Sequence, residues 1–242
     1  MRILITGANR GLGLELAKTW RAAGHEVWGS ARTADPTEFL ALEPAGSITL
    51  DLGDEASIVA GFEALATQID SLDLLVNCAG IDARAFGIED PRGPFDVAAE
   101  PFTEVIRINA TGPMLVTREA LPLLRAGADA ASRSAASRNV MVLNVSSQLG
   151  SMQVAATKGR DTSYCVSKAA LNMWSVKAAV ALRDDRISMV MLHPGWVATD
   201  MGGPSAQLTP TESATSIVAV VDGLTFEDSG RFINWDGSEH PW

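Results

Sequence analysis

Tyr164 is the only tyrosine in the chain, and Lys168 follows it four residues later in a segment with the pattern of an amphipathic helix. A spacing of four places two side chains on one face of a helix, about one turn apart. A free phenol has a pKa of about 10 and exchanges protons poorly near neutral pH. Because a nearby ammonium favours the ionised phenol, we expect Lys168 to lower the pKa of Tyr164 and make it a usable acid or base.

A glycine-rich turn follows the first apolar run and leads directly into a helical pattern. Its sequence is Thr6-Gly7-Ala8-Asn9-Arg10-Gly11-Leu12-Gly13. Glycines permit a tight turn and a close approach of the backbone to a pyrophosphate, which then lies at the positive end of the helix. The order of strand, turn and helix predicts a dinucleotide site, and the alternative is a turn without a ligand.

The end of the second strand predicts which dinucleotide is bound. An acidic residue there suits a free ribose 2′-hydroxyl, whereas a basic residue suits a 2′-phosphate. Arg32 stands at this place, Arg10 lies within the glycine turn, and no carboxylate follows until Asp35. Two guanidinium groups converging on one phosphate favour NADP(H), and the alternative is two arginines that face solvent.

Short apolar runs alternate with helical stretches, which predicts a parallel sheet covered by helices. The opening is a strand at 2–6, a helix from about 11 to 23 and a strand around 26–30, followed by strand candidates at 48–50, 72–76, 140–145, 187–192 and 231–233. We therefore predict a single-domain, Rossmann-like α/β fold over residues 1–242, with a doubly wound parallel sheet of about seven strands and helices on both faces.

Two segments interrupt this alternation. Ile81 to Pro101 is rich in proline and glycine, which predicts a loop and a short approach to the next helix. Ala126 to Arg138 is rich in alanine and serine and predicts a mobile helix end with a surface loop, for which a tolerated insertion without function is the simpler interpretation.

Composition excludes several classes of protein. With 29 acidic and 19 basic residues the net charge is −10, which disfavours nucleic-acid and anionic-membrane partners. Cys78 and Cys165 show no metal-ligand spacing, so we predict core thiols and no metal site. No apolar run approaches the ~20 residues that cross a bilayer, and the start of the sequence has no signal-peptide pattern, so the expected location is cytoplasmic.

Further motifs resemble those of the short-chain dehydrogenase/reductases, and the resemblance covers nearly the whole chain. Besides the glycine turn and the Tyr164–Lys168 pair, the matching elements are Asn77-Cys78-Ala79-Gly80, Arg107-Ile108-Asn109-Ala110-Thr111-Gly112, Asn144-Val145-Ser146-Ser147-Gln148-Leu149-Gly150 and His193-Pro194-Gly195-Trp196-Val197-Ala198-Thr199-Asp200-Met201. Cysteine replaces the family's second asparagine at position 78. The loop after His193 and the tail at 232–237 are similar to the branch of C-factor-like and sniffer-like carbonyl reductases.

The resemblance implies a catalytic group of four residues, Asn109, Ser147, Tyr164 and Lys168, with Ser146 as the alternative serine. It also implies cofactor contacts from Gly7, Asn9, Arg10, Gly11, Leu12, Gly13, Arg32, Asp51, Leu52, Asn77, Ala79, Gly80, Tyr164, Lys168, Pro194, Gly195, Val197 and Thr199. The segment Met152 to Arg160 is longer than the family's usual spacing, so the substrate-side loop is expected to be enlarged.

The expected function is reduction of an aldehyde or ketone by NADPH, or the reverse oxidation of an alcohol. Tyr164 would donate the proton and Ser147 would bind the developing oxyanion, while Lys168 would also bind the nicotinamide ribose and Asn109 would support an ordered water. Singly, Ser147 could cap a turn, Asn109 could bond its own helix and Lys168 could be solvated. His193 is expected to be structural.

Three further points stay open from the sequence. The family implies a homodimer or homotetramer formed through the helices around Asn109 and Tyr164. The C-terminal tail with Trp235 and Trp242 could line either the substrate pocket or a subunit contact. The alternative function is an NADP(H)-binding sensor or signalling protein in which catalysis is incidental.

Overall fold

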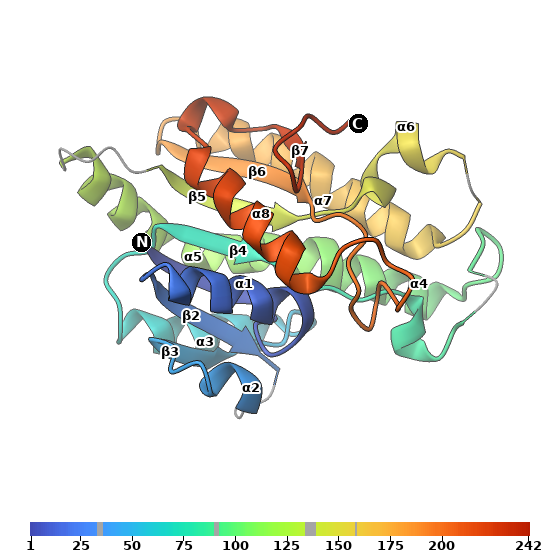
Figure 1. The fold of residues 1–242 in the computed structure, drawn as a ribbon, viewed down its shortest axis with the longest axis horizontal. Helices are drawn as coiled ribbons and strands as arrows, with labels where there is room; N and C mark the ends of the chain where they lie inside the picture. The colour runs from blue at the N-terminus through green and yellow to red at the C-terminus, as the bar shows by residue number, and fades with distance from the viewer. Residues whose placement is uncertain (33–35, 90–91, 134–138, 158) are drawn as a thin grey trace.

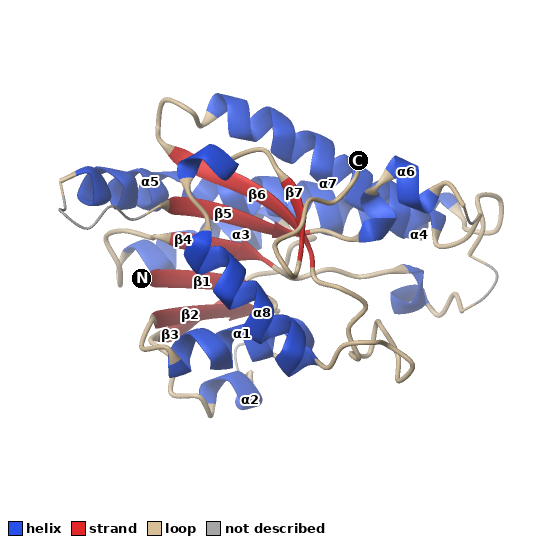
Figure 2. Ribbon diagram, turned by 45° about the horizontal axis from the view of Figure 1, so that its top comes forward, coloured by secondary structure: helices blue, strands red, loops and turns tan. Residues whose placement is uncertain are grey.

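The computed structural model describes residues 1–32, 36–89, 92–133, 139–157 and 159–242, and its central element is one parallel sheet. The strands run in the order β3-β2-β1-β4-β5-β6-β7 (Figures 1 and 2). Their bounds are β1 Arg2–Thr6, β2 Glu26–Ala31, β3 Gly46–Thr49, β4 Leu74–Asn77, β5 Val140–Val145, β6 Ile187–His193 and β7 Phe232–Asn234. The predicted fold class is therefore confirmed, and strand order reverses between β1 and β4, where such sheets bind ligands.

Helices cover both faces of the sheet, so its central strands are buried on both sides (Figure 2). One core packs against α1 (Gly11–Ala22), α2 (Thr37–Leu40) and α8 (Pro210–Gly223). The other core packs against α3 (Glu55–Ala66), α5 (Gly112–Ser132) and α7 (Thr162–Ala181). Burial on both faces explains why β4, β5 and β6 read as continuous apolar runs instead of alternating patterns.

The segment from Ala126 to Arg138 differs from its prediction. Helix α5 continues to Ser132 instead of fraying at Ala126. A side chain at Gly127 would place its Cβ 2.2 Å from the carbonyl oxygen of Leu72, so the small residue permits this helix to lie directly on the backbone before β4. Residues 134–138 lie outside the described part of the chain.

The loops predicted beside the site contain short helices. Between 81 and 101 lie η1 (Ala83–Phe86) and the start of α4 (Ala99–Ile106), and the π-helical turn η2 (Arg107–Thr111) joins α4 to α5. After β5 come η3 (Gln148–Gly150) and then α6 (Met152–Ala155), which occupies the segment expected to be enlarged. Residues 90–91 and 158 are outside the described residues.

Both cysteines are free thiols, but only one of them packs against a core. Cys78 lies against the α1 and α8 side of the sheet, and burial raises the pKa of its thiol to about 12. Cys165 is half-buried on α7 with its Sγ 3.8 Å from the carbonyl oxygen of Arg160. The prediction of a core thiol at Cys165 is therefore wrong, because this position of α7 faces the segment before the helix. Among the described helices, none has the length and hydropathy needed to cross a membrane.

Candidate active site

The carboxyl ends of four neighbouring strands gather the residues that the sequence singled out. β1, β4, β5 and β6 end at Thr6, Asn77, Val145 and His193 along one edge of the sheet. The glycine turn, the Asn77–Gly80 element, the two serines and the Pro194–Gly195 loop follow these ends directly. The crevice outside this edge is where open α/β sheets bind ligands.

Lys168 reaches from α7 into the sheet edge and is almost completely buried, with 4% of its surface exposed. Its Nζ donates a 2.8 Å hydrogen bond to the carbonyl oxygen of Val145 and lies 5.6 Å from the centroid of the Tyr164 ring. The predicted shared helix face is therefore confirmed, and the alternative of a solvated lysine is wrong. Burial lowers the pKa of Lys168 to about 8, because a buried ammonium loses its hydration.

The two serines after β5 have different partners. Ser146 Oγ donates a 2.6 Å hydrogen bond to Asn172 Oδ1 in a buried position. Ser147 Oγ accepts a 3.1 Å bond from Leu149 N, which caps η3, and its hydroxyl also hydrogen-bonds Tyr164. Ser147 is thus the serine that the fold brings to the tyrosine, while Ser146 is engaged with α7.

The pKa of Tyr164 is raised above the ordinary value of a phenol. Burial is the main cause, the Asp82 carboxylate adds to it, and the hydrogen bond with Ser147 opposes it. The expected net lowering of this pKa is therefore wrong for this arrangement of side chains, because desolvation of the phenolate is the largest contribution. The arrangement keeps the phenol protonated at neutral pH.

Asn109 connects three segments from the π-helical turn η2. Its Oδ1 accepts a 2.8 Å hydrogen bond from Ile81 N, and its Nδ2 donates to Ile81 O at 2.7 Å and to Ser167 Oγ at 3.0 Å. The alternative that its side chain bonds its own helix is wrong. The amide instead fixes the loop after β4 to α7, close to both Lys168 and Gly80, whose added Cβ would lie 3.6 Å from Lys168 Nζ.

Two glycines of the predicted turn are required by close packing. A Cβ on Gly7, whose φ is +70°, would lie 2.9 Å from Ala79 Cβ. A Cβ on Gly13 would lie 2.3 Å from the carbonyl oxygen of Gly7. The turn therefore holds α1 tightly against the ends of β1 and β4, as a pyrophosphate-binding turn must.

The N-terminus of α1 is suited to an anion. Within the described residues, Arg10 at its N-cap makes no capping hydrogen bond, and its first turn has no acidic residue. By contrast, Asp54 caps α3 through Ala56 N at 3.0 Å, and Thr209 caps α8 through Glu212 N at 3.2 Å. The free N–H groups and the helix dipole of α1 therefore fit the pyrophosphate of a dinucleotide.

The two arginines expected at a 2′-phosphate have different environments. Arg32 follows β2, is exposed, and makes no ion pair with any described residue. Arg10 instead pairs with Asp200 at 2.6 Å, which joins the glycine turn to the loop after β6. Arg10 is therefore not free for a phosphate in this arrangement, although an exposed pair of this kind is weak and easily exchanged.

The other predicted cofactor residues surround the same edge but use their side chains differently. Asp51 Oδ1 accepts from Gly53 N at 2.9 Å, and Leu52 is part of the core beside α5. Thr199 lies against the glycine turn, with its Cγ2 3.5 Å from the Cβ position of Gly11. The remaining predicted contacts lie in the turn or follow β4 and β6, namely Asn9, Leu12, Asn77, Ala79, Gly80, Pro194, Gly195 and Val197.

Sequence reasoning missed a buried polar chain beneath the site. Asn77 Nδ2 donates to Thr117 Oγ1 at 3.2 Å and to Asn144 Oδ1 at 2.8 Å, and Asn144 Nδ2 donates to Ser175 Oγ at 2.8 Å. These bonds tie β4 and β5 to α5 and α7. The only sequence signal was two asparagines at the ends of apolar runs.

His193 and the tail form an aromatic group at the end of β6. His193 is buried, its ring centroid lies 5.4 Å from that of His240, and burial lowers its pKa to about 4. Phe232 stacks against both His240 and Trp242. The carbonyl oxygen of Trp242 accepts from Gln153 N at 3.0 Å, so the tail lies beside α6 and the substrate-side segment (Figure 1).

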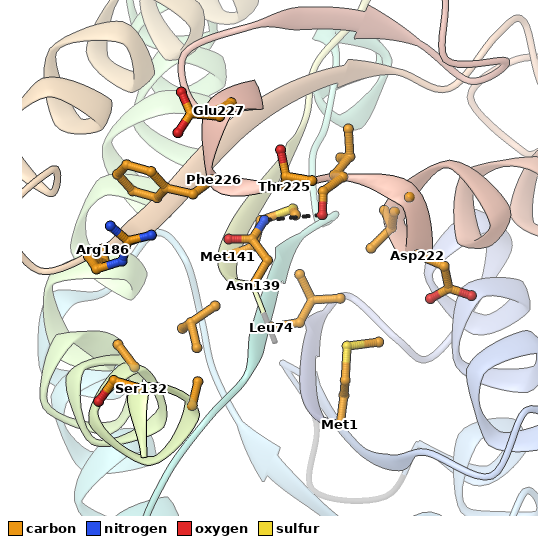
Figure 3. Close-up of a pocket in the computed structure, with 16 residues that line it drawn as sticks. Met1, Leu74, Ser132, Asn139, Met141, Arg186, Asp222, Thr225, Phe226 and Glu227 are labelled. Atoms are coloured by element: carbon orange, nitrogen blue, oxygen red, sulfur yellow. Dashed lines mark hydrogen bonds between the residues drawn. The ribbon is translucent and has the colours of Figure 1, made fainter. Parts of the chain in front are cut away.

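A separate hollow lies away from these residues. A cavity of about 550 Å³ opens at the amino ends of the strands, beside Met1, Leu74 and Met141 (Figure 3). Its charged side chains, Arg186 and Asp222 among them, are exposed. The candidate site is therefore recognised by its converging buried polar groups and not by its volume.

The doubly wound sheet, the uncapped glycine turn at its switch point and the buried cluster beside it define a Rossmann-like dinucleotide-binding protein. Residues 1–208 match the family model described as short chain dehydrogenase, and the chain belongs to the short-chain dehydrogenase/reductase family of oxidoreductases.

Individual relatives agree with this family. C-signal of Myxococcus xanthus is 41% identical over 183 residues, which cover 74% of this chain and 99% of that protein. The NADPH-bound carbonyl reductase from chicken fatty liver is 31% identical, with a TM-score of 0.88 over 100% of this chain and 98% of the other. The carbonyl reductase Sniffer of D. melanogaster is also 31% identical, with a TM-score of 0.89 over 100% and 99%. The predicted branch resemblance is thereby confirmed.

Proposed function

We propose that the protein is an NADPH-dependent reductase of an aldehyde or ketone, able to run the reverse oxidation of an alcohol. The observation that carries the proposal is the meeting of Ser147, Tyr164 and Lys168 at the sheet edge, beside the uncapped N-terminus of α1. Both structural relatives described above are carbonyl reductases, and one of them holds NADPH.

The residues of the chain supply a proton and its positioning, while the bound nicotinamide would supply the hydride. Tyr164 donates its proton to the carbonyl oxygen as negative charge develops there. The phenol is protonated at neutral pH, as this direction requires, and its raised pKa means that the transfer depends on the negative charge that develops on the carbonyl oxygen. Ser147 donates a second hydrogen bond to the same oxygen.

Lys168 and Asn109 act around the tyrosine. With a pKa of about 8, Lys168 is mainly protonated at neutral pH, and its ammonium stabilises the phenolate that remains after proton transfer. It would also bind the ribose hydroxyls of the cofactor. Asn109 holds Ile81 against α7 and thereby keeps the cofactor side of the site in place.

The preference for NADP(H) rests on Arg32. This exposed side chain follows β2 and is unpaired among the described residues, so its guanidinium is available for a 2′-phosphate. Arg10 would join it by exchanging Asp200 for the phosphate.

Assembly is proposed as a homodimer or homotetramer formed through α7, in a cytoplasmic setting. Val166, Met173 and Val180 recur every seven residues along this helix with 40%, 61% and 60% of their surfaces exposed. Side chains seven apart lie on one helix face, so they form an apolar stripe that a second copy would cover. Replacing Met173 by Glu should then reduce the mass measured by light scattering after size exclusion.

A second candidate is an NADP(H)-binding signalling protein, which the similarity to C-signal favours. Mixing the protein with NADPH and a broad panel of aldehydes and ketones separates the two functions. Loss of the reduced-nicotinamide absorbance with at least one carbonyl supports the reductase. Saturable NADPH binding without consumption across the panel would instead support the signalling function.

A further inference from the structure

Asp82 and Arg84 stand beside the candidate site, yet the proposed mechanism assigns them no role. Arg84 Nε donates to Asp82 Oδ2 at 2.9 Å and its Nη2 donates to the same oxygen at 2.5 Å. The Asp82 side chain is 13% exposed and that of Arg84 is 31% exposed, so the pair is largely removed from solvent. Pairs of this kind have well-defined geometry, unlike most surface ion pairs.

The same guanidinium contacts a second segment that is distant in the sequence. Arg84 Nη2 also donates to the carbonyl oxygen of Met201, 117 residues along the chain. Met201 lies in the loop after β6, whose Trp196 Nε1 donates to Gly202 O at 2.8 Å and whose Thr199 lies against the glycine turn. Arg84 therefore connects the loop after β4 with the loop after β6.

The position of Asp82 is fixed from the catalytic side. Ile81, its neighbour, is held at both its N–H and its carbonyl by the amide of Asn109, which also binds Ser167 on α7. Tyr164 lies one turn before Ser167 on the same helix. The Asp82 carboxylate raises the pKa of Tyr164, because it disfavours a second negative charge on the phenol.

We propose that Asp82 and Arg84 are a positioning pair that fastens the two loops flanking the candidate site and sets the charge around Tyr164. Arg84 holds the loop after β6 through Met201, and it compensates the Asp82 carboxylate. The role in turnover rests on the reductase function proposed above, whereas the loop contact and the charge effect exist without it.

Several ionisable or polar groups face the phenol from the elements packed against it. They are Asp82 from the loop after β4, Cys78 after β4, Ser147 after β5, and Cys165 and Lys168 from α7. Only Asp82 carries a negative charge at neutral pH among these groups. Its removal should therefore make Tyr164 easier to ionise.

The first test uses the fact that the chain contains one tyrosine. Labelling tyrosine with ¹³C at Cζ gives a single resonance, which reports the ionisation of Tyr164 without any assay of activity. In Asp82→Asn the titration should begin at least about 0.5 pH unit lower than in the unaltered protein, since an opposing charge is removed. An unchanged titration would overturn the charge effect.

The second test measures amide hydrogen exchange in the loop at 195–208. Arg84→Met should raise exchange several-fold there, because the donor to Met201 is lost. Asp82→Asn keeps that donor and should change the loop much less. Arg125→Met is the matched control, since Arg125 pairs with Asp185 on the exposed surface and should affect neither readout. Equal exchange in Arg84→Met and the control would overturn the fastening role.

The third test applies to turnover. In Asp82→Asn the loss of carbonyl reduction at high pH should move to lower pH, because removal of a nearby carboxylate makes both the Lys168 ammonium and the Tyr164 phenol easier to deprotonate. Arg84→Met should raise KM for the carbonyl and NADPH several-fold more than it lowers kcat. A profile identical to that of the unaltered protein would contradict the role in turnover. If the protein consumes no NADPH at all, the reductase proposal fails, while the first two tests still decide whether Asp82 and Arg84 fasten the loops and set the charge around Tyr164.

Discussion

The two ends of the parallel strands differ in what they bring together. The amino ends border a cavity of about 550 Å³ whose charged side chains lie exposed to solvent (Figure 3). The carboxyl ends hold buried Lys168, Asn109 and Ser147 in contact with polar partners. Burying polar groups costs free energy and requires hydrogen-bond partners. A convergence of such groups therefore indicates a functional site more directly than empty space does.

A large effect should come from removing the buried ammonium. Lys168→Met should lower kcat/KM for carbonyl reduction by about 10²–10⁴, since proton transfer at Tyr164 loses its supporting charge. Lys18→Met is the matched control, because Lys18 is an exposed residue of α1 that pairs with Glu15 on the surface. Steady-state kinetics of both variants makes the comparison, and similar losses in the two would contradict a specific role for Lys168.

Cofactor choice should respond to Arg32. Replacing Arg32 by Asp should move the ratio of kcat/KM for NADPH over NADH by about 100-fold toward NADH, which corresponds to losing about 2.7 kcal/mol of charge-assisted bonding. Arg125→Asp makes the same change in charge at a surface ion pair with Asp185 and should leave the ratio unchanged. If both variants keep the original ratio, Arg32 does not select the cofactor.

Stability in acid should depend on His193. Its pKa of about 4 in the folded protein lies below the ordinary value of about 6.5, so the unfolded chain binds more protons between these values. Stability should therefore be lost as pH falls through this window, by about 2 kcal/mol between pH 7 and pH 5. Denaturant unfolding of His193→Gln at both pH values should show a smaller loss, and parallel losses would argue against this histidine.

The smallest effect on activity should come from the amino ends. Asn139 contacts Ser188 and Leu224 through its amide beside the cavity. Asn139→Ala should lower the free energy of unfolding by about 1 kcal/mol while kcat/KM stays within about twofold. A large loss of activity, measured beside the thermal stability, would mean that both ends of the sheet serve the reaction.

The sequence predicted the elements with strong local signals. β1 and β5 have the expected bounds because apolar runs flanked by turn residues leave little choice. The end of α5 was missed because alanine and glycine resemble a loop until Gly127 is seen against the backbone of Leu72. That contact is tertiary, and no local pattern reports it.

The sequence predicted which residues gather at the carboxyl ends of the strands, but it did not predict their electrostatics. The glycine turn and the Tyr164–Lys168 spacing are local features, so their placement followed from the sequence. The raised pKa of Tyr164 depends on burial and on Asp82, and the engagement of Arg10 depends on Asp200 across 190 residues. Such electrostatic effects arise only when segments distant in the sequence come together in the fold.

The most direct test of the account is the pair of measurements on Tyr164→Phe, which keeps the ring and removes the proton. Carbonyl reduction should fall by at least about 10³, because the proton donor is gone, while the Kd for NADPH changes by less than about threefold. Turnover close to that of the unaltered protein would contradict the assignment of Tyr164 as the proton donor at the carboxyl edge of the sheet.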